Sequence, residues 1–307
     1  MRRFYKAIYK LGLKRPYQKI DRLRYFNRLS RGGKSPFDDW AYANEDSYQH
    51  SEGEVLICSP FRDIRVLFYC NPRSLVERKI IRDGLYDHHI LQYMEALHVP
   101  HSIVIDVGAN IGAYAIPLAK AFGDIEIHAF EPNPFAVERL RRNLSMNGVK
   151  NVLLQQYAVG AQPGRMDLHA FGENDLGLSS LIPPSKEGSK NIPVEVITLD
   201  GFYGMKQRPI SLIKIDVQGF ELGVLQGGRS LIPKQKPYIL LDHEDDLFRQ
   251  PLQADEVKRN MRDLFSEWGY TVFYMAKFDP FMLFPVSWNR PLFGTLLAIP
   301  QVFNPGK

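Results

Sequence analysis

The sequence predicts an α/β protein with a doubly wound, mostly parallel sheet, and three observations support this fold. Five short, almost continuous apolar runs occur after residue 101, as in parallel strands that are buried on both faces. The runs are SIVIDVG, EIHAFEP, VLLQQYAVG, SLIKIDVQG and YILLDHE. A glycine-containing turn follows the first run, and a helical pattern, PFAVERLRRNLSMNG, follows the second. This alternation of strand and helix is typical of a Rossmann-like sheet.

The segments on either side of these runs complete the expected fold. Residues 54–70 contain two strand patterns joined by a polar turn, which predicts a hairpin laid against the main sheet. A helical pattern follows over residues 75–99 and is interrupted at Gly84. A long insertion over residues 164–202 surrounds a loop rich in Gly, Pro, Ser and Asn, and we expect it to contact substrate. Two closing strands are expected within residues 271–300.

The chain of 307 residues is long enough for one large core and an extension, so we place a domain boundary near residue 50. Residues 1–50 are a basic N-terminal extension and linker, and residues 51–307 are the main domain. Residues 1–34 contain twelve Lys or Arg and one acid, Asp21, for a local charge of +11. Because the whole chain carries +5, the other 273 residues carry −6, which disfavours a nucleic-acid partner.

The basic arm, residues 1–34, also places apolar side chains at helical spacing, including Phe4, Ile8 and Leu11. Two interpretations stay open. In the first, the arm lies on an anionic membrane surface. In the second, it packs on the body of the protein or on a second subunit of a homo-oligomer.

The chain has two cysteines, Cys58 and Cys70, and both stand at the ends of apolar runs. This favours buried thiols in a reducing compartment over a disulfide. The sequence shows neither a bilayer-spanning apolar stretch nor a secretory signal pattern. We therefore expect a cytoplasmic protein, peripheral to the membrane where the arm binds it.

The turn in SIVIDVGANIG indicates the cofactor. An acid, Asp106, precedes Gly108 by two residues, and Asn110 stands where a dinucleotide-binding turn has its second glycine. A pyrophosphate needs closely approaching backbone N–H groups and is repelled by a neighbouring carboxylate. A cofactor with a cationic head and no phosphate fits better, which favours S-adenosylmethionine and disfavours an NAD-linked oxidoreductase. Glu131, at the end of the second run, can accept hydrogen bonds from both ribose hydroxyls.

The segments VIDVGANIGAYAIPLA, AFEPNPFAVERLRRNLSMNG, AVG, VITLD and LIKIDVQGFELGVLQGG occur in this order. Together they resemble the FkbM-type S-adenosylmethionine-dependent methyltransferases, over about residues 80–245. The resemblance implies a class I methyltransferase fold for residues 51–307 and O-methylation of a hydroxyl, commonly on a sugar, glycan or natural product. The cofactor-binding residues that it implies are Asp106, Gly108 and Asn110 near the methionine portion, Glu131 at the ribose and Ala158 near the adenine, to which we add Tyr114 in the first helix.

The chain departs from the family pattern at two positions. Gln218 stands where an acid is frequent in IDVEG, which weakens any mechanism that needs two carboxylates at this point. Asp87 follows Tyr86, where a glutamate is often seen.

The transfer reaction requires alignment of donor and acceptor and removal of a proton from the hydroxyl. Asp216, at the end of the fourth run, is the first candidate base, and His243, after the fifth, is the second. In an alternative, Asp216, Asp242 and Glu244 hold a divalent metal, although our main prediction contains no metal. Lys214, within the fourth run, is assigned a structural role.

The predicted function is O-methylation of a hydroxyl-bearing small molecule or glycan. The alternative is a non-catalytic protein that binds the cofactor and acts as a partner, or as a membrane-associated scaffold through its basic arm. The residues do not identify the acceptor, because specificity resides in loops that the fold does not determine.

Overall fold

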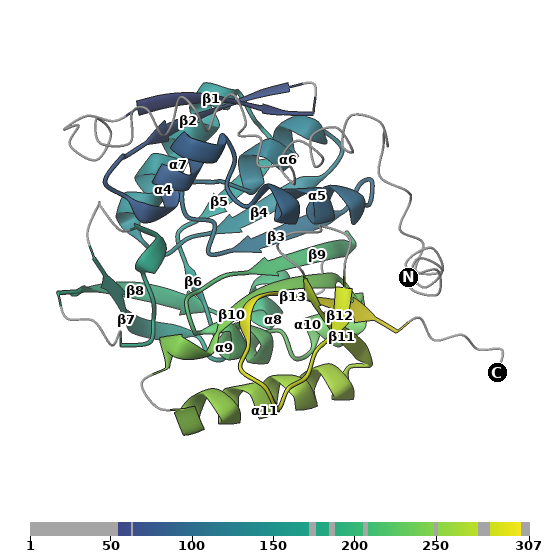
Figure 1. Cartoon of the computed structure of the whole chain (residues 1–307). Helices are drawn as coiled ribbons and strands as arrows, with labels where there is room; N and C mark the ends of the chain where they lie inside the picture. Colours follow the sequence, from purple (N-terminus) through teal and green to yellow (C-terminus); the bar gives the residue numbers. More distant parts are fainter. Residues whose placement is uncertain are drawn as a thin grey trace, which may run out of the picture.

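The computed structural model describes residues 55–62, 64–171, 176–183, 188–204, 208–248, 251–275 and 283–301. Its centre is an eight-stranded sheet with the strand order β12-β11-β13-β10-β9-β3-β4-β5 (Figure 1). The strands are β3 (Ile103–Val107), β4 (Glu126–Phe130), β5 (Val152–Gln155), β9 (Ile210–Ile215), β10 (Tyr238–Glu244), β11 (Tyr270–Met275), β12 (Leu283–Pro285) and β13 (Phe293–Pro300). β10, β9, β3, β4 and β5 are parallel, whereas β13, β11 and β12 form an antiparallel edge. The predicted fold and the two closing strands are confirmed.

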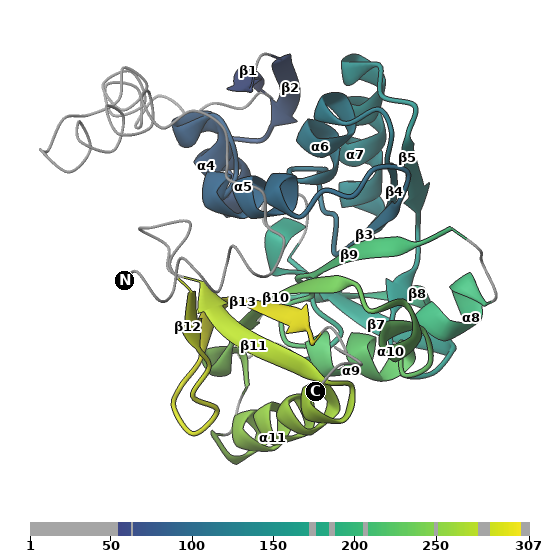
Figure 2. The same ribbon diagram turned by 90° about the vertical axis from the view of Figure 1, so that its right-hand side faces the viewer.

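Helices cover both faces of this sheet, as Figure 2 shows. One face carries α4 (Leu75–Asp83), α5 (His88–Ala96), α6 (Ala115–Ala121) and α7 (Pro134–Asn147); the other carries α8 (Leu199–Tyr203), α9 (Glu221–Gly227), α10 (Leu231–Gln235) and α11 (Pro251–Glu267). Leu212 and Leu240 pack with the first group of helices, and their neighbours Ile213 and Leu241 pack with the second. Because side chains alternate along a strand, this pattern decides which face each polar residue at a strand end occupies.

The expected hairpin forms, from β1 (Val55–Phe61) and β2 (Ile64–Cys70), but its predicted position against the main sheet is wrong. It is a separate two-stranded sheet that contacts α6 and α7. The reason is the polar side of α7. Asn147 accepts a hydrogen bond from the Leu67 backbone N–H at 2.9 Å, and Asn143 accepts one from Tyr69 N–H at 2.9 Å. These two asparagines satisfy the edge of β2 that another strand would otherwise pair with.

The third predicted strand is also divided. VLLQQYAVG gives β5 in the main sheet and β6 (Ala158–Val159) in a small sheet with the order β6-β8-β7. The insertion supplies the other two strands, β7 (Gly164–Ala170) and β8 (Lys190–Ile197), which are antiparallel. A short 3-10 turn, η1 (Leu176–Leu178), lies between them in sequence. The insertion is therefore a folded layer at the side of the sheet, as Figure 1 shows.

Three further expectations can be compared with the structure. The interruption at Gly84 is confirmed, because α4 ends there with a φ of +81°. The expectation of two buried thiols is wrong for Cys58, which is exposed on the hairpin, and right for Cys70. The basic arm and the linker to residue 50 lie outside the described residues, so their contacts stay a prediction.

Within the described part of the chain, no helix combines the length and the apolar character that crossing a bilayer requires.

Gly227, the last residue of α9, is packed against the backbone of the small sheet. A Cβ at this position would lie 2.0 Å from the carbonyl oxygen of Gly160. We expect Gly227→Ala to lower the free energy of unfolding by about 1–3 kcal/mol, because overpacking forces the backbone to shift. Gly123→Ala is the control, since nothing lies within 4 Å of its Cβ position, and it should change stability by less than about 0.5 kcal/mol. Equal effects of the two substitutions in chemical denaturation would contradict the close approach.

Candidate functional site

A cavity lies where the parallel strands β3, β4 and β9 end. Its empty space of about 810 Å³ includes an open mouth. The turn after β3, the residues after β4 and β9, the insertion, and two tyrosines all contribute to its wall. Lining residues include Tyr86, Gly108, Asn110, Tyr114, Glu131, Tyr157, Ala158, Ser179, Leu181, Lys214, Asp216 and Gln218. This is the position where open α/β sheets bind ligands.

The turn after β3 brings backbone close to backbone. Gly108 has a φ of +78°, and a Cβ on it would lie 1.9 Å from the carbonyl oxygen of Asp216. No other residue type fits there without a shift of the main chain. The N–H groups of Gly108 and Ala109 both donate to the Phe130 carbonyl, at 2.9 and 3.0 Å. The side-chain oxygen of Asn110, which also lines the cavity, is buried without a hydrogen-bond partner among the described residues.

Glu131 links this turn to the start of α7. Its Oε2 accepts a hydrogen bond from Asn110 N–H at 2.8 Å, and its Oε1 accepts one from Asn133 N–H at 2.9 Å. Burial raises the pKa of Glu131 to about 7, although the two backbone N–H groups oppose this rise. Each oxygen has a second lone pair, so the carboxylate can still accept hydrogen bonds from a ligand. The predicted ribose-binding residue thus also holds the walls of the site together.

Lys214 is a buried cation in the cavity wall, 5% exposed. Its Nζ lies 3.1 Å from Asp106 Oδ1, donates to the Gly108 carbonyl at 3.0 Å, and is 3.7 Å from Asp216 Oδ2. Burial alone would lower the pKa of Lys214, but the charges of Asp106 and Asp216 outweigh burial and raise it. Burial also raises the pKa of Asp106, and Lys214 opposes that rise. We assign an ion pair, since the ammonium would otherwise be uncompensated in a buried site.

This pair separates two of the predicted site residues. Asp106, fully buried, lies behind Lys214 and is not part of the cavity wall, whereas Asp216 is. Asp106 therefore acts on the site through Lys214. Lys214, to which the sequence assigns a structural role, is also part of the cavity wall. A lysine inside an otherwise apolar strand was the available signal.

Asp216 and Asp242 stand at the ends of neighbouring strands on the face that carries α6. Asp216 Oδ1 accepts a hydrogen bond from Gln218 Nε2 at 3.0 Å, and its side chain is 21% exposed. Asp242 Oδ1 accepts one from Thr295 Oγ1 at 2.9 Å. Burial, and then the charge of Asp216, raise the pKa of Asp242 to about 7. The described residues contain no group of three His, Cys, Asp or Glu side chains arranged to hold a metal ion, so the metal alternative gains no support from this geometry.

His243 lies on the opposite face of β10 from Asp242, because side chains alternate along the strand. It is 1% exposed, with Nε2 at 3.0 Å from Asp245 Oδ1 and Nδ1 at 3.7 Å from Glu221 Oε2. It is absent from the cavity wall. The structure therefore does not bring the two candidate bases together, and only Asp216 reaches the cavity.

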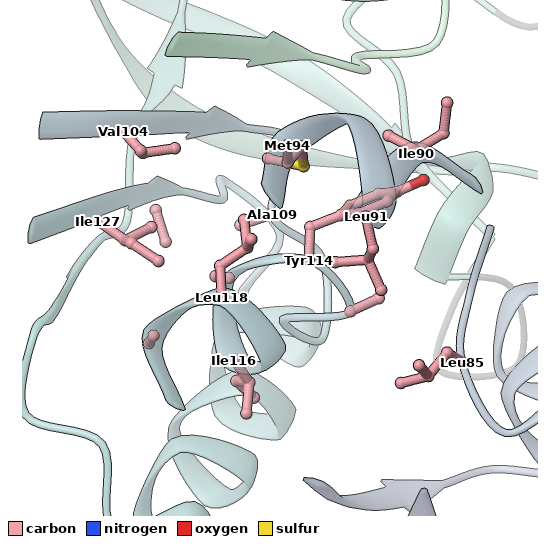
Figure 3. Close-up of a cluster of buried hydrophobic side chains, with 14 of the residues drawn as sticks. Leu85, Ile90, Leu91, Met94, Val104, Ala109, Tyr114, Ile116, Leu118 and Ile127 are labelled. Atoms are coloured by element: carbon pink, nitrogen blue, oxygen red, sulfur yellow. The ribbon is translucent and has the colours of Figure 1, made fainter. Parts of the chain in front are cut away.

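Tyr86, in the turn between α4 and α5, and Tyr114, at the start of α6, meet in the wall. The rings of Tyr86 and Tyr114 make an edge-to-face contact at 5.8 Å, and Lys214 Nζ lies 4.9 Å from the Tyr114 ring centroid. Figure 3 shows the Tyr114 ring among apolar side chains, with its hydroxyl extending toward Ile90. Burial and neighbouring carboxylates raise the pKa of both phenols, so both stay protonated at neutral pH. Tyr114, Gly108, Asn110, Glu131 and Ala158 all line the cavity as predicted.

The insertion supplies wall residues that sequence reasoning missed. Ser180 Oγ donates to the Gln218 carbonyl at 2.6 Å, and Asn133 Nδ2 donates to Ser179 Oγ at 2.9 Å. These bonds fasten the insertion to β9 and α7. The length and position of the insertion indicated the region, but no pattern within it singled out these serines.

Comparisons with known proteins give one matching family and several similar proteins. The methyltransferase FkbM domain family matches residues 106–272. A 2-O-methyltransferase NoeI from Sinorhizobium fredii (strain NBRC 101917 / NGR234) is 29% identical over 170 residues, which cover 50% of this chain and 68% of that protein. A hexuronic acid methyltransferase AglP from Haloferax volcanii is 30% identical over 157 residues, covering 50% and 62%. The crystal structure of a methyltransferase FkbM from Methylobacillus flagellatus KT matches with a TM-score of 0.42 and 17% identity, over 66% of this chain and 44% of that one.

The raised pKa of Asp242 predicts a pH-dependent effect on stability. The folded chain retains a proton on Asp242 up to about pH 7, whereas the unfolded chain releases it near the ordinary value of 3.8. The free energy of unfolding should therefore fall as pH rises between these values. Asp242→Asn keeps the acceptor for Thr295 and removes the charge, so it should be neutral at pH 4 and stabilising at pH 8, by on the order of 1–3 kcal/mol.

Denaturant titrations at the two pH values measure this difference. Asp167→Asn, on an exposed part of β7, is the control and should show no such pH dependence. A stabilisation by Asp242→Asn that is equal at both pH values would show that ionisation of Asp242 is not its cause.

Proposed function

The chain belongs to the FkbM methyltransferase family, and we propose that it transfers a methyl group from S-adenosylmethionine to a hydroxyl of a sugar, glycan or natural product. One observation carries the proposal. A single cavity at the strand ends holds a carboxylate with lone pairs for a diol, Glu131, and an accessible carboxylate, Asp216, beside two tyrosine hydroxyls. The two relatives described as a 2-O-methyltransferase and a hexuronic acid methyltransferase support a sugar hydroxyl as the acceptor.

S-adenosylmethionine is the cofactor that this site fits. Gly108 leaves room for a ligand to approach the backbone, and Asn110 presents a buried side-chain oxygen that lacks a partner among the described residues. Glu131 would hold the ribose diol, Ala158 would lie near the adenine, and Gly108 and Asn110 would lie near the methionine portion. When bound, the cofactor supplies an electrophilic methyl group on a positively charged sulfur.

The charges of the wall suit a cationic ligand. Lys214 neutralises Asp106 behind the wall, and Asp216 and Glu131 remain as carboxylates on the cavity itself. Opposite charge favours binding of the sulfonium and ammonium groups, and the buried setting strengthens that attraction. A phosphate-bearing cofactor would be repelled by the same carboxylates.

Asp216 is the residue that takes the proton from the acceptor hydroxyl. Gln218 donates a hydrogen bond to Oδ1 and so orients the carboxylate, while Oδ2 faces Lys214 at 3.7 Å. The position at which this chain departs from the family pattern thus carries a hydrogen-bond donor to the proposed base. Alignment of the hydroxyl with the methyl group would complete the chemistry, because the leaving group is already activated.

Glu131→Gln tests the cofactor assignment. Gln keeps the size of the side chain but has one acceptor oxygen, so it can keep only one of the two hydrogen bonds from Asn110 N–H and Asn133 N–H. We expect the Kd for S-adenosylmethionine in calorimetry to rise about 10- to 100-fold, since a charge-assisted hydrogen bond contributes about 1.5–3 kcal/mol. Glu138→Gln, on the exposed side of α7, is the control. An unchanged Kd in a variant with a cooperative thermal transition would refute the assignment.

Asp216→Asn tests the proposed base, because it keeps the shape and removes the proton acceptor. We expect cofactor affinity within a few-fold of the original, and formation of S-adenosylhomocysteine slower by about 100-fold or more. The acceptor for this measurement is the most active member of a panel of neutral, amino and acidic glycosides. Turnover within a few-fold of the unmodified protein would assign proton removal to solvent or to another group.

A further inference from the structure

The face of the β1–β2 hairpin that points away from the core is apolar. Alternate side chains of the two strands pack into the core, and the hairpin is the outermost described element on its side of the molecule (Figure 1). The outward side chains are Leu56, Cys58, Leu67 and Tyr69, which we call the outer patch. Leu56 lies opposite Tyr69, Cys58 lies opposite Leu67, and Leu56 is 51% exposed. A sheet face that meets only water is ordinarily polar, so this composition indicates a docking surface.

The hairpin also presents an open strand edge and two positive charges. Among the described strands, β1 pairs with β2 alone. Arg65 lies on the same face as the outer patch, and the Arg142 guanidinium carbon lies 3.4 Å from the Tyr69 ring centroid. Both arginines are exposed. A partner that combines apolar side chains with carboxylates would complement this surface.

The segment that leads directly into β1 has this composition. Residues 35–54, SPFDDWAYANEDSYQHSEGE, contain six Asp or Glu and no Lys or Arg, for a charge of −6. The same segment contains four aromatic residues: Phe37, Trp40, Tyr42 and Tyr48. Because residues 1–34 carry +11 and the whole chain carries +5, residues 55–307 have no net charge. The net negative charge that follows the basic arm therefore resides in this segment, which we call the acidic linker.

We propose that the acidic linker docks on the outer patch, with its aromatic side chains on the apolar ones and its carboxylates beside Arg65 and Arg142. The linker ends at Glu54 and β1 begins at Val55, so docking is intramolecular and has a high effective concentration. Gly53, its only glycine, permits the reversal of direction that docking requires. The basic arm is a poorer occupant, because its charge of +11 would face two guanidinium groups.

Cys58 reports the docking, because the chain has two cysteines and the other, Cys70, is buried. The rate of its alkylation by uncharged iodoacetamide is measured by mass spectrometry on the full chain. The aromatic variant keeps every charge of the linker and combines Phe37→Ser, Trp40→Ser, Tyr42→Ser and Tyr48→Ser. We expect Cys58 to react at least about 10-fold faster in this variant, since a covered thiol reacts only when the linker undocks. Cys70 should stay unlabelled in both proteins, which checks that the variant is folded.

The arm variant is the matched control for charge outside the linker. It combines Lys6→Gln, Lys10→Gln and Lys14→Gln, and it should leave the Cys58 rate unchanged because the arm is not the occupant. The rate in the unmodified protein should also be independent of protein concentration, since the linker and the outer patch belong to one chain.

Trp40 reports the same contact from the linker. Subtraction of a Trp40→Phe counterpart isolates its emission from that of the two other tryptophans. Leu56→Asp places a carboxylate in the outer patch and repels the linker, so we expect acrylamide quenching of Trp40 to rise about 3-fold or more as the indole becomes exposed. Leu153→Asp is the matched control, because Leu153 is 43% exposed on β5, at the edge of the main sheet, and it should leave the quenching unchanged.

Equal Cys58 rates in the unmodified protein and the aromatic variant would overturn the inference, as would Trp40 quenching that Leu56→Asp leaves unchanged. Protection of Cys58 that is lost on dilution would assign the outer patch to a second copy of the chain. Protection that needs anionic vesicles would assign it to a membrane, and protection that is lost in the arm variant would assign it to the basic arm. Methyl transfer enters none of these measurements, so the inference stands or fails separately from the proposed function.

Discussion

The buried ammonium of Lys214 is the interaction on which the rest of the site depends. It joins the end of β9 to the end of β3, through Asp106 and the Gly108 carbonyl. Without it, Asp106 would be a buried, uncompensated charge, and the turn after β3 would lose its tie to β9. Breaking such a buried pair costs about 3–5 kcal/mol, which is a large part of the stability of an ordinary domain. The same ammonium determines the charge of the cavity, because it cancels one carboxylate and leaves the others to the ligand.

The sheet was predictable because its strands are buried on both faces, and such strands appear in sequence as continuous apolar runs. The errors lie at its margins. The hairpin was expected to lie against the main sheet, but it packs on α6 and α7, and the edge of β2 is satisfied by Asn143 and Asn147, which are 74 and 80 residues away along the chain from their partners. The run from residue 152 to 160 was taken as one strand, although its second half pairs with β8 of the insertion. The apolar pattern of one strand does not show which other strand it pairs with.

Open α/β sheets bind ligands at the carboxyl ends of their parallel strands, and this rule predicted where the site lies. It did not predict the direction in which each side chain points. It grouped Asp106, Asp216 and His243 because all stand at or near the ends of parallel strands. The two-residue period separates His243 from the two aspartates: Asp106 and Asp216 share the face of Val104 and Leu212, and His243 shares the face of Leu241. Asp106 lies on the same face as Asp216 but is not part of the cavity wall, whereas its ion-pair partner Lys214 is. The first distinction was available from the sequence once the faces of the sheet were known. The second required the packed structure.

Three carboxylates at this edge of the sheet have distinct environments, and these determine what each can do. Asp106 is buried against an ammonium, so its charge is neutralised and it serves to position Lys214. Glu131 receives two backbone N–H groups, which direct its oxygens and commit it to holding the turn and a bound diol. Asp216 is the most exposed of the three and has one hydrogen bond, from Gln218, to one of its oxygens. Its second oxygen, Oδ2, lies 3.7 Å from Lys214 Nζ. These environments are why we propose Asp216 as the group that removes the proton, since the other two carboxylates are already engaged by the fold.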